Sequence, residues 1–221
     1  MNEWLELLKW EDLLAATIET LYMTVISVFI TFVLGLILGL LLFLTGKGNM
    51  WENRFINLII ATFVNIFRSI PFIILIVLLI PFTKALVGSM LGANAALPAL
   101  IIGSAPFYAR MVEIALREID KGVIEASHSM GASNFEIIFK VLIPEALPAL
   151  ISGITVTAIA LVSYTAMAGV IGAGGLGNFA YLEGFQGNNT LLTFVATVLI
   201  LIIVFIIQII GDVFTKIIDK R

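Results

Sequence analysis

The sequence predicts an all-α membrane protein that crosses the bilayer five times, and three observations carry this prediction. Of the 221 residues, 61% are hydrophobic and only 12% are charged, whereas soluble domains carry about 25% charged residues. The apolar residues gather in five long runs, each sufficient to cross about 30 Å of hydrocarbon as a helix. Polar residues, glycines and prolines separate the runs as loops would. We therefore expect one polytopic domain with short loops.

The predicted spans follow one another at short intervals. They cover residues 17–44, 56–80, 95–116, 147–171 and 191–214. Pro98 and Pro106 interrupt the third run, so we expect this helix to be kinked and to lie among neighbours that satisfy the freed carbonyls. Dividing the second and third runs around Pro81 instead would move their boundaries by several residues.

Lysine and arginine residues are distributed unevenly between the two ends of the spans. One side receives Lys47, Arg54, Arg117, Lys121, Lys140, Lys216, Lys220 and Arg221. The other side receives only Lys9 and Lys84. Because cytoplasmic loops carry the excess of positive charge, we expect the first set to lie in the cytoplasm. Residues 1–16 then form an extracytoplasmic N-terminal segment, residues 17–214 the transmembrane domain, and residues 215–221 a cytoplasmic tail.

The residues that the chain lacks exclude several kinds of chemistry. It contains no cysteine and one histidine, His128, so we predict no catalytic residue and no metal centre. Residues 172–177, GAGGLG, satisfy G-x-G-x-x-G but follow a predicted span instead of a strand, so we interpret them as a turn and not as a dinucleotide site. No Walker lysine motif occurs, so we expect this chain to bind no cofactor itself. The net charge of -3 gives no reason to expect nucleic acid as a partner.

The least lipid-like part of the chain lies at about residues 118–146, between the third and fourth predicted spans. Ser133 followed by Glu136 fits a capping box, so we expect a new helix to start at Ser133. Glu136 and Lys140 are spaced as an i,i+4 ion pair. Apolar side chains recur at three- and four-residue spacing and form a stripe: Phe135, Ile138, Phe139 and Leu142.

The pattern leaves two interpretations of this stripe open. A helix lying on the lipid headgroups would turn such a face to the membrane, and a helix docked in a groove would turn it to a partner protein. Gly131, just before the stripe, permits a sharp backbone path or a close approach that a side chain would block. Pro144 and Pro148 are expected to delimit the turn into the fourth span.

A second pattern overlaps the stripe. Glu125-Ala126-Ser127 is followed by Gly131 and then, after nine residues, by Val141-Leu142-Ile143-Pro144. This pattern resembles the EAA loop of type I ABC-importer permeases, which ordinarily runs Glu-Ala-Ala, three residues, Gly, nine residues, Ile, any residue and Leu-Pro. The departures at Ser127, Val141 and Ile143 are small or apolar exchanges. Five further stretches resemble the methionine branch of that family: NIFRSIPFI (65–73), GSAPFYARMVE (103–113), IEAS with MGA, PEALPALISG and GAGGLG.

The resemblance implies a five-span permease of a bacterial cytoplasmic membrane that works as a homodimer on D- or L-methionine. It implies two copies of a separate ATPase subunit, which binds ATP and Mg, and an extracytoplasmic substrate-binding lipoprotein. In that family the EAA loop is the coupling helix that docks into the ATPase. The resemblance therefore assigns this role to Glu125, Ala126, Ser127, Gly131, Ala132, Phe135 and Pro144.

Two alternatives to a methionine importer remain open at this point. The same permease architecture serves other amino acids, such as histidine or cystine. An ion-coupled secondary transporter is the alternative class. It would need broken and usually repeated helices, and we see no such repeat in this sequence.

Candidates for a translocation path come first from the fourth predicted span. Ser163, Tyr164 and Met167 interrupt a run rich in Val, Ile and Leu. Tyr164 and Met167 are three residues apart, so one helix face presents both. The flexible side chain of methionine suits a gate that repacks around an apolar substrate. Ordinary helix packing is the alternative.

The second predicted span supplies Arg68 and Ser69 as further candidates for the path. A small, polar stripe precedes Arg68, and we expect this face to turn into the bundle, because a charge within the bilayer must face protein or water. Snorkelling or a local ion pair is the structural alternative for Arg68. Arg110 and Glu113, one turn apart in the third span, are expected to form a local ion pair.

Overall fold

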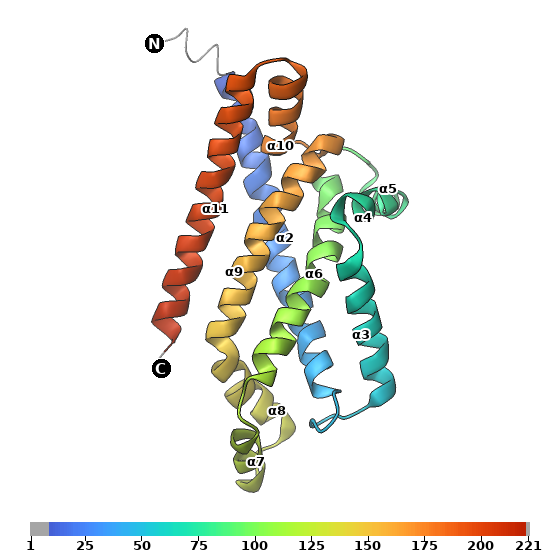
Figure 1. Ribbon diagram of the computed structural model, residues 1–221. Helices are drawn as coiled ribbons and strands as arrows, with labels where there is room; N and C mark the ends of the chain where they lie inside the picture. The colour runs from blue at the N-terminus through green and yellow to red at the C-terminus, as the bar shows by residue number, and fades with distance from the viewer. Residues whose placement is uncertain (1–8, 220–221) are drawn as a thin grey trace. The chain divides into compact units, whose positions relative to one another are not determined.

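The computed structural model of the chain describes residues 9–219, and the elements over that range are helices, with no strand (Figure 1). The described residues divide into two compact units. The first unit draws on residues up to Ile30, on Ile70–Gly103 and on Ala158–Gln208. The second unit draws on Thr31–Ser69, Ser104–Thr157 and the described residues from Ile209 onward.

Four helices are long and apolar enough to cross a membrane. They are α2 (Trp10–Leu44), α6 (Ala93–Arg117), the continuous stretch Asn134–Ala173 that includes α9 (Ile143–Ala168), and α11 (Thr190–Ile218). A fifth span is present if the bent pair α3 (Arg54–Ser69) and α4 (Phe72–Leu78) counts as one. The all-α polytopic fold is therefore confirmed.

The predicted second span, over residues 56–80, is wrong as a single straight helix. Its two halves, α3 and α4, meet at an angle of 106°. Pro71 begins the second half with a backbone φ of -55° and ψ of 133°, and a residue before proline disfavours the α conformation. The chain therefore turns at residues 70–71 and then continues through α5 (Ile80–Val87), which has Pro81 in its first turn.

Prolines elsewhere do not end their helices. The helix α6 continues as one element through Pro98 and Pro106. The turn expected at Pro144 and Pro148 is absent, because α8 (Asn134–Ile137) leads through the π-helical turn η1 (Ile138–Leu142) directly into α9. The Ile143 N–H donates to the Ile138 carbonyl, five residues back. The wider turn shifts the hydrogen-bond ladder immediately before Pro144, which has no N–H to contribute.

The predicted domain boundaries meet the described helices as follows. The helix α2 begins at Trp10, so the second half of the predicted segment 1–16 is already helical. Residues 1–8, at the start of that segment, lie outside the described residues, as do Lys220 and Arg221 of the predicted tail.

Close packing of α2 against α6 holds the second unit together. A Cβ added at Gly35 would lie 2.7 Å from Cδ1 of Tyr108, and one added at Gly39 would lie 2.5 Å from Cβ of Val112. The spacing Gly35-x-x-x-Gly39 is the small-residue pattern that lets membrane helices approach closely. Tyr108 is fully buried, and its hydroxyl donates to the Leu150 carbonyl on α9 at 3.2 Å.

The helix contact at Gly39 makes a testable prediction. Gly39→Leu overpacks the contact with α6, and overpacking a core costs about 1–3 kcal/mol. We expect thermal unfolding of the detergent-solubilised protein several degrees lower, since each kcal/mol shifts the midpoint of a chain of this size by about 2–4 °C. The control is Val33→Leu, at a position of α2 that is 41% exposed. An unchanged midpoint for the glycine variant would contradict the packing described here.

Candidate functional site

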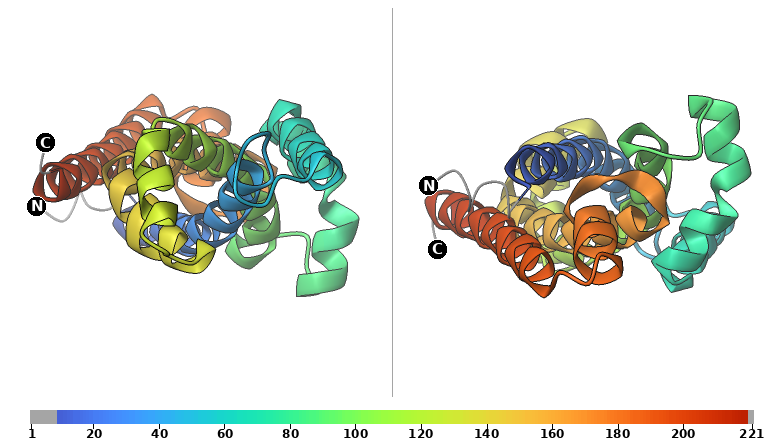
Figure 2. Two further views of the ribbon diagram at one scale, coloured as in Figure 1. Left: turned by 90° about the horizontal axis from the view of Figure 1, so that it is seen from below. Right: turned by 90° about the horizontal axis from the view of Figure 1, so that it is seen from above.

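The segment with the EAA-like pattern folds into α7 (Lys121–Ser129) and α8, which lie where α6 ends and α9 begins (Figures 1 and 2). The side chain of Asp120 caps α7 by accepting from the Gly122 N–H at 2.6 Å. Between the two helices, Gly131 adopts a backbone φ of +86°, and a Cβ there would meet no atom within 4 Å. Within this chain, glycine is therefore used for the sharp turn and not for a close approach.

The predicted capping box and ion pair are both confirmed at the start of α8. The Ser133 N–H donates to Glu136 Oε2 at 3.1 Å, and the Glu136 N–H donates to Ser133 Oγ at 3.4 Å. Lys140 Nζ donates to Glu136 Oε1 at 2.9 Å. The hydrogen bond from Lys140, together with those from Ser133, lowers the pKa of Glu136 from its ordinary value of 4.5 to about 2.

Glu136 lies before residues 147–171, the part of its helix that is predicted to span the membrane. The continuous stretch from Asn134 to Ala173 has 40 residues, whereas about 20 residues suffice to cross the hydrocarbon. Because its pKa is lowered, ionised Glu136 stabilises the capped helix at all pH values above 4.5. That contribution is lost as the pH falls from 4.5 toward 2.

The predicted apolar stripe divides between two faces. Ile138 and Leu142 are buried in the core of the second unit, whereas Phe135 and Phe139 are 65% and 63% exposed. The prediction of a single stripe was therefore wrong. The outward phenylalanines form an exposed apolar face, and the rings of Trp51 and Phe135 meet in an edge-type contact with centroids 5.9 Å apart. The sequence analysis missed Trp51, because it comes from the loop after α2 and shares no spacing with the stripe.

The other predicted coupling residues lie on both sides of this segment. Glu125 and Ala126 are exposed on α7, and Pro144 is exposed at the start of α9. Ser127 is buried, and its hydroxyl donates to the Val123 carbonyl at 2.7 Å. Ala132 is half-buried against the core of the second unit. Residues 118–146 therefore form a small folded segment with exposed and buried residues, which we call the platform.

The predicted path residues of the fourth span lie in the first unit. Tyr164 is half-buried and stacks on Phe72 of α4, with ring centroids 4.4 Å apart and the planes 6° from parallel. Met167 is 45% exposed, and Ser163 is exposed as well. The partner ring of Tyr164 could not be found from spacing, because Phe72 lies beyond the bend at Pro71.

Arg68 and Ser69 lie in the second unit, at the end of α3. The predicted face was expected to turn into the bundle, but Thr62, Asn65 and Arg68 are exposed in the single chain. The prediction is wrong for these three residues in this chain. Two other members of the predicted stripe, Asn57 and Ala61, are half-buried, and α3 buries Val64. The Ser69 hydroxyl donates to the Asn65 carbonyl at 2.7 Å, and Arg68 forms no ion pair with any residue in the described range 9–219.

The glycine-rich stretch contains the expected turn at residues 172–174, and residues 175–177 begin the helix α10 (Gly175–Phe179). Gly172, Gly174 and Gly175 all have positive φ, at 98°, 83° and 78°. The Gly175 N–H donates to Glu19 Oε2 at 2.6 Å, which ties the turn to α2. Spacing along the chain could not predict this contact, because Glu19 lies 156 residues earlier.

One buried carboxylate accounts for the predicted ion pair in α6. Glu113 is buried, with Arg110 at 2.5 Å and Arg117 at 2.6 Å from its two oxygens. The pair of Arg110 and Glu113 is confirmed, and Arg117 is an additional partner on the next turn. Over residues 9–219, no group of three or more His, Cys, Asp or Glu side chains could hold a metal ion.

The cap of α8 makes a second prediction. Ser133→Ala removes the acceptor of the Glu136 N–H, and loss of such a cap costs about 1 kcal/mol. We expect hydrogen exchange of that amide to be about fivefold faster. The control is Ser129→Ala, whose hydroxyl donates to the Glu125 carbonyl within α7 and caps no helix start. Equal exchange in the two variants would contradict the capping role.

Comparison with known proteins places this architecture among transport proteins. The family described as "Binding-protein-dependent transport system inner membrane component" matches residues 31–221. The methionine import system permease protein MetP of Bacillus subtilis is 72% identical over 210 residues, covering 95% of each chain. The D-methionine transport system permease protein MetI of Escherichia coli K12 is 53% identical over 151 residues, covering 68% of this chain and 70% of that protein.

Two solved structures resemble the chain. The MetNI methionine ABC transporter in an inward-facing conformation matches with a TM-score of 0.94 and 47% identity, covering 96% of this chain and 98% of the other. An amino acid ABC transporter solved with histidines matches with a TM-score of 0.77 at 20% identity, covering 96% and 97% of the two chains. This second likeness concerns the fold alone.

Proposed function

The chain belongs to the family of binding-protein-dependent transport system inner membrane components, and from this premise we propose that it is the permease subunit of an ATP-binding-cassette importer for methionine. The observation that carries the proposal is the 72% identity with the methionine import system permease of Bacillus subtilis, over 95% of both chains. The chain is a transport component with several membrane-spanning helices, and the proposal adds its substrate, D- or L-methionine, and its partners.

The proposed assembly contains two copies of this chain, two ATPase subunits and an extracytoplasmic substrate-binding lipoprotein. The ATPase subunits bind ATP and Mg and carry out the hydrolysis. The N-terminus lies outside and the C-terminus in the cytoplasm, with residues 1–16, 17–214 and 215–221 as the three segments. The uneven distribution of lysine and arginine supports this orientation.

The proposed docking site for the ATPase is the platform at residues 118–146. Its outward face carries Phe135 and Phe139, an apolar surface of the kind that a helix presents to a groove. The helix that begins at Asn134 runs through η1 and α9 to Ala168. A displacement of the platform is therefore transmitted along one helix, which also carries Tyr164 and Met167.

The experiment that tests the function is uptake of labelled L-methionine into proteoliposomes that contain this chain, its ATPase and its binding protein. We expect uptake to require ATP and all three components, and unlabelled methionine to compete. Competition only by another amino acid, such as histidine or cystine, would contradict methionine as the substrate. Uptake that follows an ion gradient without ATP would contradict the importer itself.

Gly131→Glu is expected to abolish uptake while the permease remains in the membrane. The substitution places a charge and a side chain at the turn between α7 and α8, where docking is proposed. Gly88→Glu is the matched control, because Gly88 has a φ of +81° and open space within 4 Å, much as Gly131 does. Equal loss of uptake in both variants would attribute the effect to backbone strain and not to coupling.

Tyr164→Ala tests the proposed gate. It removes the ring that stacks on Phe72, so we expect ATP-independent leak of methionine to rise in the reconstituted transporter. Tyr181→Ala is the control, because Tyr181 also stacks on a phenylalanine, Phe185, at 5.9 Å. If leak and uptake both stay at the parent level in the Tyr164 variant, the gate assignment is wrong.

A further inference from the structure

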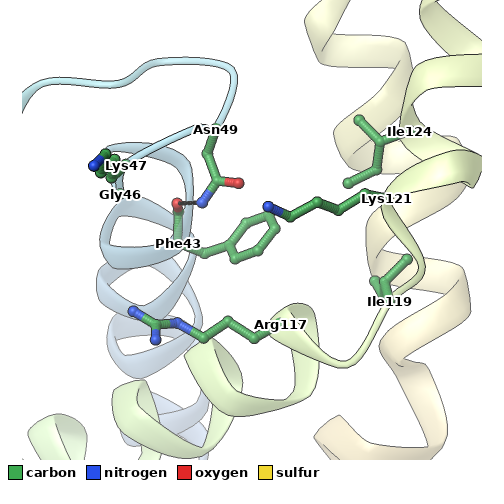
Figure 3. A pocket seen from close by; sticks show the side chains of 8 residues that line it. All are labelled: Phe43, Gly46, Lys47, Asn49, Arg117, Ile119, Lys121 and Ile124. Carbon is green, nitrogen blue, oxygen red and sulfur yellow. Dashed lines mark hydrogen bonds between the residues drawn. The ribbon is translucent and has the colours of Figure 1, made fainter.

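A basic hollow lies in the second unit, beside the start of α7 (Figure 3). Its volume is about 410 Å³. The residues that line it are Phe43, Gly46, Lys47, Asn49, Arg117, Ile119, Lys121 and Ile124. Three separate elements contribute: the end of α2 with the loop after it, the end of α6, and the start of α7.

The charge around this basic hollow is unbalanced. Lys47, Arg117 and Lys121 line it, and no carboxylate does. Lys47 and Lys121 form no ion pair with any residue from 9 to 219. Arg117 pairs with Glu113 through one nitrogen at 2.6 Å, and a guanidinium has five N–H donors, so further donors remain. The basic hollow is therefore suited to an anion.

Part of the lining of the basic hollow is apolar. Phe43, Ile119 and Ile124 belong to or pack against the core of the second unit. The Asn49 amide is fixed beside them, because its Nδ2 donates to the Phe43 carbonyl at 2.5 Å. Figure 3 shows Lys121 extending toward Asn49 and Phe43, with Arg117 on the other side of the Phe43 ring. A ligand here would meet cations and hydrocarbon together.

The position along the helices indicates which anion fits. The apolar helix α2 ends at Leu44 and α6 ends at Arg117, so the basic hollow lies at the ends of two helices that are long and apolar enough to span a membrane. Basic pockets at this level on the cytoplasmic side bind the phosphates of lipid headgroups. A free phosphate would satisfy the cations but would make no use of the apolar wall.

We propose that the basic hollow binds the headgroup phosphate of an anionic phospholipid of the cytoplasmic leaflet. The phosphate lies among Lys47, Arg117 and Lys121, and the glycerol and upper acyl chain lie against Phe43 and Ile124. The choice of leaflet rests on the orientation given under the proposed function. Because Lys121 is the first residue of α7, the bound lipid also holds the start of the platform.

The test counts phosphatidylglycerol molecules retained by the purified permease–ATPase complex, using native mass spectrometry after titration with the lipid. Lys47→Gln and Lys121→Gln are each expected to weaken retention about fivefold, which corresponds to about 1 kcal/mol for a basic residue near an anionic surface. The double variant is expected to weaken it about 25-fold. Lys216→Gln, in the last turn of α11 and outside the basic hollow, is the matched control and should retain lipid as the parent does.

Three results would overturn the proposal. Equal retention by the parent and the double variant would show that the lysines do not bind the lipid. Displacement of phosphatidylglycerol by millimolar inorganic phosphate alone would assign the basic hollow to a free anion. Loss of the ATPase from the double variant, with lipid retention unchanged, would assign it to the ATPase. Lipid retention needs no transport, so its failure is distinguishable from absence of methionine uptake, which would contradict the proposed function instead.

Discussion

The backbone N–H and C=O groups at the end of a helix have no hydrogen-bond partner within that helix. Near or inside a membrane they must find partners elsewhere in the protein, and this requirement determines the structure at the helix ends. The last four carbonyls of α2 show how it is met. Leu41 accepts from the Thr45 N–H, and Leu44 from the Trp51 N–H. The side chain of Asn57 donates to the Leu42 carbonyl at 2.8 Å, and that of Asn49 donates to the Phe43 carbonyl. The loop after α2 is therefore folded by its hydrogen bonds to the helix that precedes it.

The same requirement links the fold to the candidate sites. Folding the loop onto α2 places Trp51 against Phe135, and it places Lys47 at the edge of the basic hollow. In the first unit, the N–H of Gly175 in the glycine-rich turn donates to the carboxylate of Glu19. A polar side chain within an apolar helix is costly unless it has a hydrogen-bond partner. Here such side chains find their partners in the backbone groups of the turns. The candidate sites in the second unit therefore lie at helix ends.

The sequence predicted most of the helices, because apolar runs bounded by polar residues have few alternative folds. It also predicted the cap at Ser133 and the ion pair of Glu136 with Lys140, since both depend on residues within one turn. It failed at Pro71, where a proline broke a helix, and at Pro144, where a π-helical turn allowed the helix to continue. One proline therefore ends a helix and the other does not, and the local spacing of residues cannot distinguish the two cases.

Contacts between distant segments could not be predicted either, because local spacing carries no information about them. Three contacts join residues that are far apart in the sequence. They are the stacking of Phe72 on Tyr164, the hydrogen bond from Gly175 to Glu19, and the packing of Gly39 on Val112. The family resemblance located the platform without these contacts. Only the structure divides its apolar residues into a buried face and an exposed one.

The exposed face of the platform is our proposed docking site for the ATPase. The chain contains no cysteine, so single cysteines introduced as Phe135→Cys and Phe139→Cys can be cross-linked in the assembled transporter without background from other positions of this chain. We expect cross-links from both positions to the ATPase subunit, and none from Phe205→Cys on α11, which is 62% exposed in the single chain. Labelling of both cysteines by a lipid-confined reagent, with no cross-link to the ATPase, would contradict the account and would place this face on the membrane surface.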